Sequence, residues 1–497
     1  MDVMTKQSRG MSSFVGKLRE KLTSGGALRN HAFRGGTWLG FGGALEQLFR
    51  FGRSMLLTRL LAPEAFGVMA IVYSASAVVD MLAEIGVKEA IIQNPKGQDD
   101  DFVNSAWWLA FGRGIGIYLL LFAAAPWIAR FYGNPELVPL MRVALLSIVF
   151  QGAQSSRSYV ALKEMKFKRW ALIQSGGGVC GSLIVVAMAF VVKSVWALAI
   201  GYAAENCVRC LASYVICPFR PRLKIDKDSL KELLRFSKGV FGLSFLNLIF
   251  SRADIFVLGK LYPAAQLGIY AMAVYLIQVP TSFIMGVLSQ TLMPSFARIQ
   301  EDSPRINRIL VRVTSVLLIL GMPIAIFVIF GSGSLLSLFY GPRYAGASLP
   351  LTVAALVAIV NLMNSLITMA FYATGRPHLH RRCVLIMAVL MIAAIYPAAR
   401  HFGPVGGQLA ALAAVVAGYL SQLVDIRRLT RLDLAGYAKS FPFVFAVSCG
   451  VMGLLWGVRH LVVTSQPFVN LLFGMFGCIL ALGFCGGILL RQLSTET

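Results

Sequence analysis

Long apolar segments separated by short polar connections run along most of this chain and restrict what it can fold into. About fourteen of these segments reach the roughly 20 mainly apolar residues that a helix needs to cross a bilayer. The chain is 57% hydrophobic and only 14% charged. Its apolar residues do not alternate with polar ones as they do in the wall of a transmembrane barrel. The sequence therefore predicts an all-α polytopic membrane protein.

The predicted spans are spread along the chain, and the first and seventh carry charges. The first six cover residues 36–58, 66–84, 104–124, 138–156, 171–192 and 194–216. The next eight cover residues 239–258, 265–290, 310–332, 348–373, 383–399, 404–424, 441–458 and 467–490. Residues 1–34 are polar and basic, so we expect the first apolar segment to be retained as a span.

Lysine and arginine are distributed unevenly between the two sides of the predicted bundle. Of the 46 Lys and Arg residues, roughly 33 fall on the side of the N-terminus and about 7 on the other. Cytoplasmic loops carry the excess of Lys and Arg, so both termini are predicted to be cytoplasmic. A net charge of +24 would suggest nucleic acid as the partner of a soluble protein. Here its placement fits membrane topology, and no nucleic acid is expected.

Two basic clusters stand out on the predicted cytoplasmic side. They follow the fourth and sixth spans and consist of Lys163, Lys166, Lys168 and Arg169, and of Arg220, Arg222, Lys224 and Lys227. Their simplest interpretation is that they fix topology and lie near anionic membrane lipids. Binding of a polysaccharide polymerase or co-polymerase is the alternative.

The residues that usually indicate catalysis or cofactor binding are missing. Cys207 and Cys210 form a CVRC sequence, but they fall inside a predicted span and are better explained as small packing residues. The five histidines fall in predicted loops or termini, and no phosphate-binding GxxxxGK[ST] loop occurs. We therefore expect no enzyme, no metal site and no cofactor. Transport would use an ion gradient or the concentration difference of the cargo.

An internal repeat divides the apolar region. RLLAPEAFGVMAI at residues 59–71 resembles KLYPAAQLGIYAM at residues 260–272, a constant offset of 201 residues that aligns Gly67 with Gly268. Six spans separate the copies, and an even number gives them the same orientation. Two six-helix lobes related by an axis normal to the membrane are expected, unless the similarity is an accident of composition. The predicted parts are a basic segment 1–34, an N-lobe 35–216, a linker 217–238, a C-lobe 239–426 and two further helices in 427–497.

Charged residues inside the spans need an explanation, because an arginine at a helix centre costs about 2.5 to 3.5 kcal/mol. Some can be paired locally: Glu46 with Arg50 and Glu205 with Arg209 are each four residues apart on one helix face. Two others, Arg113 and Arg142, can reach an interface by extending their side chains. Glu46, Asp80 and Asp254 are candidate coupling or ion-pair residues.

Arg50, Arg53 and Arg252 are harder to explain by local pairing. Arg50 and Arg53 share a face of the first span, while Arg252 lies in the equivalent span of the second lobe. In a two-lobed transporter these spans would line the central cleft, so the arginines either contact cargo or form structural pairs. A guanidinium binds phosphate through paired hydrogen bonds and keeps its charge when partly desolvated. A cationic cleft therefore favours an anionic headgroup.

Several strings of residues resemble a known family. RLLAPEAFGVMAIVYSASAVVDMLAEIGVKEAIIQ at residues 59–93, YGNPELVPLMRVALLSIVF, ALKEMKFKRWALIQ and LMPSFARIQED at residues 292–302 are similar to the Wzx-type polysaccharide flippases. Within that group the chain most resembles exporters of colanic acid and comparable exopolysaccharides. The family lies within the multidrug/oligosaccharidyl-lipid/polysaccharide exporter superfamily.

This resemblance implies both a fold and an activity. The fold is two pseudo-symmetric six-helix bundles forming a V-shaped cleft, with two additional C-terminal helices. The activity is flipping of undecaprenyl-diphosphate-linked oligosaccharide repeat units across the bacterial inner membrane. Arginines of the first span and of the start of the second lobe bind substrate in related flippases, which corresponds here to Arg50, Arg53 and Arg252.

Two other functions remain open at the level of sequence. One is a cation-coupled multidrug antiporter of the same superfamily, whose cleft would need an excess of acidic residues. The other is a non-transporting scaffold of a polysaccharide synthesis complex, in which charged cleft residues would be dispensable.

Overall fold

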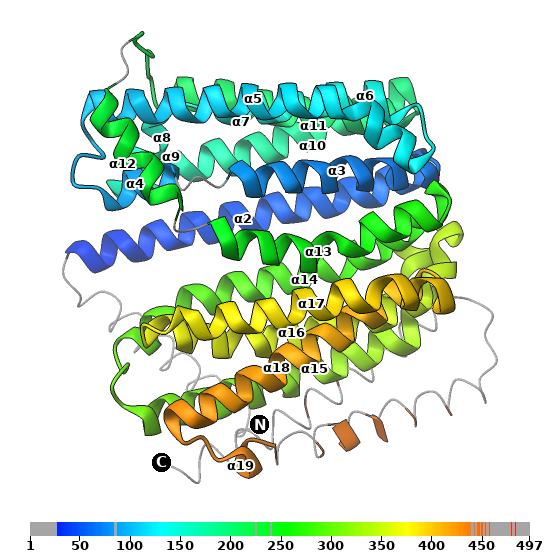
Figure 1. The fold of residues 1–497 in the computed structure, drawn as a ribbon. Coiled ribbons are helices and arrows are strands. Elements are labelled where there is room, and N and C mark those ends of the chain that lie inside the picture. The colour runs from blue at the N-terminus through cyan, green and yellow to red at the C-terminus, as the bar shows by residue number, and fades with distance from the viewer. Residues whose placement is uncertain are drawn as a thin grey trace, which may run out of the picture.

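The computed structural model of the chain describes residues 27–83, 87–223, 226–238 and 241–438, with a few short stretches between 442 and 483. Every regular element within these residues is helical and none is a strand, which confirms the predicted all-α class. The long helices lie side by side along one common direction (Figure 1). Helices from the first half of the chain occupy one part of the bundle, and helices from the second half occupy the other (Figure 1).

Each predicted span up to residue 424 corresponds to a helix or a broken helix. In the first half these are α2 (Ala27–Leu60), α3 (Pro63–Ala83), α5 (Asp100–Tyr132), α6 (Leu137–Ala144), α7 (Leu146–Gly152), α9 (Phe167–Ala171), the π-helical turn η1 (Leu172–Gly176), α10 (Gly177–Val192) and α11 (Val195–Ile216). In the second half they are α13 (Phe241–Leu261), α14 (Ala264–Ala297), α15 (Ser303–Tyr340), α16 (Ser348–Ala373), α17 (Pro377–Phe402) and α18 (Val405–Thr430). We call α2 to α11 the N-lobe and α13 to α18 the C-lobe.

Length and apolarity alone qualify seven of the described helices as able to cross a membrane. The number rises to eight if Leu137–Gly152 and Arg157–Lys163, which meet at a bend of 55°, count as one span. Helices α2, α11 and α13, which carry charged residues, are not among them, and α3 is counted only as a shorter apolar helix over Pro63–Val78. The predicted spans 441–458 and 467–490 lie largely outside the described residues.

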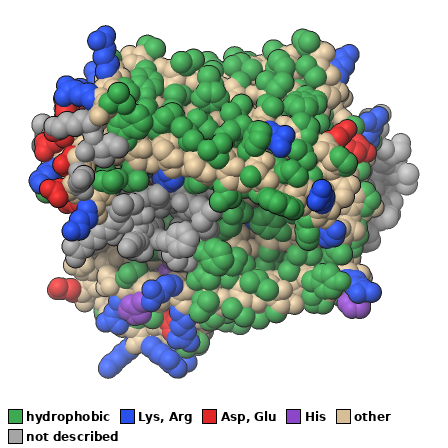
Figure 2. All heavy atoms as spheres, turned by 45° about the horizontal axis from the view of Figure 1, so that its top comes forward, with side chains coloured by type: hydrophobic (Ala, Val, Ile, Leu, Met, Phe, Trp, Pro, Cys, Tyr) green, Lys and Arg blue, Asp and Glu red, His purple; other side chains and the backbone are tan. Residues whose placement is uncertain are grey.

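Polar and apolar side chains are segregated on the surface. Hydrophobic side chains are spread over much of the described surface seen in Figure 2, whereas most of the Lys, Arg, Asp and Glu side chains that it shows lie toward the margins. Exposed apolar residues occur along the helices rather than only at their ends, as Leu120 of α5, Leu183 of α10 and Ile392 of α17 illustrate. An apolar belt between charged ends is the arrangement that a bilayer requires.

Three short helices that the sequence analysis missed cover one end of the N-lobe: α4 (Val87–Gln93), α8 (Arg157–Lys163) and α12 (Lys227–Lys238). The segment predicted only as a linker therefore contains a helix. Leu233 of α12 is buried against Val87 and Phe102. Asn104 of α5 donates to the backbone oxygen of Arg222 and accepts from its backbone nitrogen, at 2.9 and 2.8 Å. The linker is thus docked on the N-lobe.

The two lobes meet at a reciprocal contact between α3 and α14. A Cβ atom added to Gly67 would lie 1.9 Å from the carbonyl oxygen of Ala264, and one added to Gly268 would lie 1.9 Å from that of Pro63. Pro63 and Ala264 are themselves 201 residues apart, so the same contact occurs twice with the partners exchanged. A twofold relation produces this pattern. The contact therefore supports the repeat that the sequence predicted.

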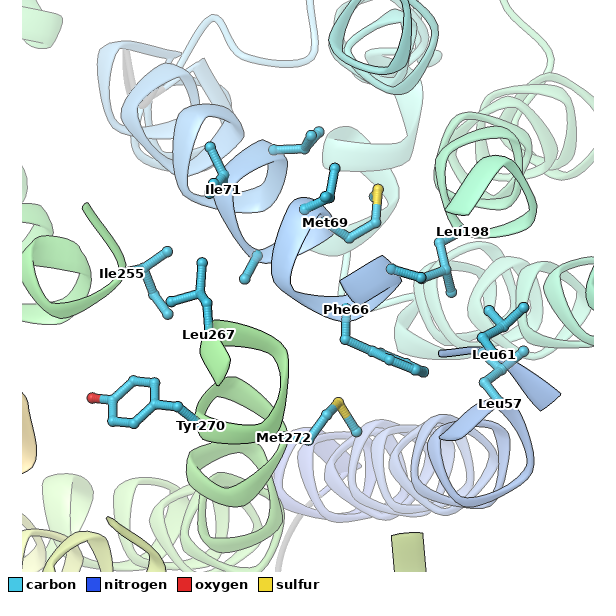
Figure 3. Close-up of a cluster of buried hydrophobic side chains, with 14 of the residues drawn as sticks. Leu57, Leu61, Phe66, Met69, Ile71, Leu198, Ile255, Leu267, Tyr270 and Met272 are labelled. Carbon is cyan, nitrogen blue, oxygen red and sulfur yellow. The ribbon is translucent and has the colours of Figure 1, made fainter. Parts of the chain in front are cut away.

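The largest hydrophobic core joins the two lobes around this contact. It includes Leu57, Phe66 and Met69 from the N-lobe, and Leu267 and Met272 from the C-lobe. Figure 3 shows these side chains converging from α2, α3 and α14. At this level of the bundle the lobes are packed together, and the candidate site lies beside the packed region.

Candidate functional site

A cavity of about 400 Å³ lies between the lobes and is lined by α2, α3, α10, α11, α13 and α14. All three arginines predicted to contact cargo, Arg50, Arg53 and Arg252, line it. Glu205 and Asp254 line it as well, so arginines outnumber carboxylates among the charged residues described in its wall. The structure thus brings together the arginines of the first span and of the second lobe, which are about 200 residues apart in sequence.

Arg50 and Arg53 belong to an ion network between α2 and α11. Arg50 Nε lies 3.1 Å from Glu46 Oε1, and Arg50 Nη2 donates to Glu205 Oε1. Arg209 Nη2 lies 2.7 Å from Glu46 Oε1 and 3.1 Å from Glu205 Oε1. Arg53 Nη1 is 3.5 Å from Glu205 Oε2. Both pairs predicted at a spacing of four residues are therefore confirmed, but they form parts of one larger network.

The network is buried, which explains why its members share partners. The side chain of Glu205 is only 4% exposed, that of Glu46 18%, and those of Arg53 and Arg209 17% each. Buried charges are tolerated when each has opposite charges and further hydrogen bonds around it. Glu205 satisfies this condition with three guanidinium groups.

Glycines of α10 make room for the network. A Cβ atom on Gly177 would lie 2.3 Å from Cγ of Arg209, and one on Gly178 would lie 2.5 Å from Oε1 of Glu46. A Cβ atom on Gly181 would lie 2.4 Å from Cγ of Glu205. The π-helical turn η1 directly precedes these residues, and such turns often occur at functional sites. One glycine-rich helix face therefore encloses three of the charged side chains.

Arg252 differs from the other two arginines. It is half-buried on α13, and within the part of the chain that the structure describes its guanidinium has no hydrogen bond or ion pair. Its neighbour Asp254 is buried and accepts a hydrogen bond of 2.7 Å from the Tyr270 hydroxyl. The same hydroxyl accepts a hydrogen bond from Gln408. Asp254 thus lines the cavity but is held by hydrogen bonds within the C-lobe. Among the described residues it forms no ion pair with an arginine.

The remaining charged residues singled out in the spans lie elsewhere. The side chain of Asp80 falls outside the described residues. Arg142 is packed over the ring of Phe122, with its guanidinium carbon 4.0 Å from the ring centroid, and neither it nor Arg113 lines the cavity. Cys207 and Cys210 are free thiols, as expected for packing residues. Among the described residues no cluster of His, Cys, Asp and Glu suits a metal ion.

Tyrosines that the sequence analysis did not single out form part of the cavity wall. Tyr73 of α3 and Tyr202 of α11 meet edge to face with ring centroids 5.0 Å apart, and Tyr202 shares a hydrogen bond with Ser76 at 3.1 Å. Tyr275 of α14 lines the same cavity. Tyrosine combines an apolar ring with a polar tip. Nothing in the sequence distinguishes these three tyrosines from aromatic residues of the hydrophobic core, because each is a single aromatic residue in an apolar span.

A second cavity, of about 560 Å³, lies between α2, α14 and α15. Its lining is almost wholly apolar and includes Phe51, Phe283 and Phe339. Gln47 Nε2 of α2 donates to Ser282 Oγ of α14 at 3.4 Å beside it. Among the residues that the structure describes, no charged side chain lines this cavity. The first cavity is therefore the candidate site for a charged ligand.

A family described as polysaccharide biosynthesis protein matches residues 56–349, which is more than half of the chain. The chain belongs to this family. The matched region contains Arg252, Glu205 and most of the helices that line the cavity. The resemblance seen in the sequence is therefore confirmed at the level of the family.

Similar proteins occur in several bacteria. The chain is 23% identical over 397 residues to the lipopolysaccharide biosynthesis protein WzxC of Escherichia coli K12, covering 79% of each chain. It is 21% identical to the teichuronic acid biosynthesis protein TuaB of Bacillus subtilis 168, covering 75% of this chain and 78% of that one.

Solved structures agree with the fold. The lipid II flippase MurJ in an inward closed conformation aligns with 92% of this chain and 99% of its own, with a TM-score of 0.75 at 15% identity. A multidrug resistance transporter of the MATE family in an inward-facing conformation aligns with 78% of this chain, with a TM-score of 0.60 at 13% identity. These similarities confirm the architecture that was predicted for this chain.

Proposed function

We propose that this protein flips undecaprenyl-diphosphate-linked oligosaccharide repeat units across the bacterial inner membrane by alternating access. The observation that carries this proposal is the cavity between the lobes, in which Arg50, Arg53 and Arg252 converge. The names of WzxC and TuaB place those relatives in the synthesis of surface polysaccharides. The fold is shared with a lipid II flippase. Transport, and not catalysis, is the activity that this combination supports.

The arginines suit the diphosphate that links lipid and sugar. Guanidinium groups bind phosphate oxygens through paired, charge-assisted hydrogen bonds. Arg252 has no ion pair among the described residues, and Arg53 has one long contact at 3.5 Å, so both have donors to offer. A cavity of about 400 Å³ is in the range of small-molecule sites. It can take the diphosphate and the adjoining sugar while the lipid tail stays in the membrane.

Alternating access would use the two lobes as rigid halves. The lobes are packed together where α3 crosses α14 at Gly67 and Gly268, and the arginine cavity lies beside that crossing. Rocking of two similar bundles about such a contact exposes a central site to each side in turn. We place both termini in the cytoplasm, because the cytoplasmic side is the one that carries excess Lys and Arg.

The charge of the cavity distinguishes the proposal from the two alternatives. A cation antiporter needs a cavity that attracts positive charge, whereas here three arginines face two carboxylates, and one of these, Asp254, is held by Tyr270. A scaffold has no need for buried arginines in a central cavity, and these cost about 2.5 to 3.5 kcal/mol each to insert. An anionic cargo explains their presence.

The test is export of polysaccharide by cells that carry single substitutions. Removing one charge-assisted contact costs about 1.5 to 3 kcal/mol, so Arg252→Ala should weaken cargo binding roughly 10- to 100-fold. Arg53→Lys keeps the charge but loses the planar fork, so its defect should be smaller than that of Arg53→Ala. Accumulation of lipid-linked repeat units on the cytoplasmic face measures the defect.

Arg142→Ala is the matched control, because Arg142 is a partly buried arginine that lies outside the cavity. Immunoblots of membrane fractions exclude loss of protein as the cause of a defect. Full export by Arg252→Ala and Arg53→Ala variants at normal abundance would contradict the cationic-cavity mechanism.

A further inference from the structure

Glu205 of α11 occupies an unusual position in the arginine cavity. It lines the cavity with Arg53 and Arg252, and its side chain is only 4% exposed. Its Oε1 atom accepts from Arg50 and lies 3.1 Å from Nη2 of Arg209, while its Oε2 atom lies 3.5 Å from Nη1 of Arg53. The carboxylate therefore faces the guanidinium groups that the proposed function assigns to the cargo.

Carboxylate and phosphate oxygens are alternative acceptors for the same guanidinium donors. We infer that Glu205 is an internal counterion that competes with the diphosphate of the cargo for Arg53 and thereby sets the affinity for anionic lipid. When cargo binds, Arg53 exchanges the Glu205 carboxylate for a phosphate oxygen. This inference rests on the proposed function and assigns a determinant of affinity within the same site.

The geometry identifies Arg53 as the arginine that is exchanged. Arg50 and Arg209 each contact both Glu46 and Glu205, whereas Glu205 is the only acidic partner of Arg53 among the described residues, at the longest distance in the network. After the exchange, Glu205 keeps Arg50 and Arg209 as partners. The exchange thus avoids a buried carboxylate without a counterion, which would be strongly destabilising.

The charges also fit a diphosphate. Three arginines and two glutamates give the network one positive charge in excess. Arg252 adds a positive charge to the cavity, and Asp254, which accepts a hydrogen bond from Tyr270, adds a negative one on the side of the C-lobe. A diphosphate that joins a lipid to a sugar carries one negative charge on each phosphate. Arg53 and Arg252, on opposite lobes, can therefore each neutralise one phosphate and draw the lobes together around the headgroup.

The inference can be tested by measuring binding of undecaprenyl diphosphate to the purified full-length protein in detergent, with undecaprenol as the neutral comparison lipid. Glu205→Gln keeps the size of the side chain but removes its charge. It should tighten binding of undecaprenyl diphosphate roughly tenfold, because one charge-assisted competitor is lost. Binding of undecaprenol should not change.

Glu46→Gln is the matched control, because it removes one negative charge from the same network but from a residue that does not contact Arg53. If Glu205 competes directly for Arg53, Glu205→Gln must tighten diphosphate binding clearly more than Glu46→Gln does. Equal effects of the two variants would show that only net charge matters. A Glu205→Gln variant that binds the diphosphate no better than wild type would likewise overturn the inference, while leaving the proposed function intact.

Failure of the proposed function has a different signature. In that case the wild-type protein itself would bind undecaprenyl diphosphate no better than undecaprenol. Thermal unfolding in detergent shows whether each variant is folded. If Glu205→Gln is not folded, Glu205→Asp replaces it. The side chain of Asp is shorter, so its carboxylate should withdraw first from the 3.5 Å contact with Arg53 and should also tighten diphosphate binding. If Glu205→Asp does not bind the diphosphate more tightly than wild type, the inference is overturned.

Discussion

The crossing of α3 and α14 gives a prediction whose size follows from the structure. Gly67→Ala would place a Cβ atom 1.9 Å from the backbone oxygen of Ala264, and Gly268→Ala would place one 1.9 Å from that of Pro63. Real Cβ atoms essentially never approach another heavy atom to less than 3.0 Å, so the helices must separate by about an ångström or more. Overpacking of this kind costs about 1 to 3 kcal/mol. Because the two contacts are reciprocal, both substitutions should destabilise the protein by similar amounts.

Thermal unfolding in detergent measures this effect, and Gly286→Ala is the control. Gly286 lies on α14 like Gly268, but a Cβ atom there would meet none of the described residues within 4 Å. In a helix interior such a change from Gly to Ala stabilises by about 0.5 to 1 kcal/mol. The reasoning is wrong if Gly67→Ala and Gly268→Ala behave like Gly286→Ala, or if only one of the pair is destabilising.

Two further predictions concern topology and the ion network. In a cysteine-free background, a cysteine at the exposed position of Glu64 should react with an impermeant maleimide in intact spheroplasts. A cysteine at the exposed position of Lys166 should react only after the spheroplasts are lysed. The reverse pattern would refute the assigned orientation. Gly181→Ala would force α10 away from Glu205, since its Cβ atom would lie 2.4 Å from Cγ of that residue, and should destabilise the protein by about 1 to 3 kcal/mol. Gly176→Ala, with no described atom within 4 Å, should not do so in the same unfolding measurement.

The helices could be predicted from the sequence wherever an apolar run alone determines them. Each predicted span from 36–58 to 404–424 has its helix, because a bilayer demands a long apolar segment. The short helices α4, α8 and α12 lack such a run and were missed. The helix α12 is stable because Leu233 is buried against residues of α4 and α5, a long-range contact that local sequence does not reveal. The break at Leu145 between α6 and α7, within the span predicted at 138–156, was also missed.

The candidate site was only partly visible in the sequence. Arg50, Arg53 and Arg252 could be identified because a charge in a membrane span needs a reason, and the repeat placed them on equivalent spans. Glu205 was interpreted only as the local partner of Arg209, which is correct but incomplete. Its contacts with Arg50 and Arg53 join residues more than 150 positions apart. Only the folded structure, in which side chains of α11 and α2 meet, shows that the carboxylate of Glu205 has three arginine partners.

The glycines of α10 show how such a network can exist in a membrane protein at all. Small residues in a membrane helix usually allow another helix to approach closely. Here Gly177, Gly178 and Gly181 face Arg209, Glu46 and Glu205, so the space that they leave is filled by charged side chains. Larger side chains at these positions would push the ions toward lipid, where each unpaired charge is costly. Glu46 and Glu205 thus form one structural unit with the glycines of α10. An anionic cargo can be inferred only from the arginines that still have hydrogen-bond donors to offer beside this unit, Arg53 and Arg252.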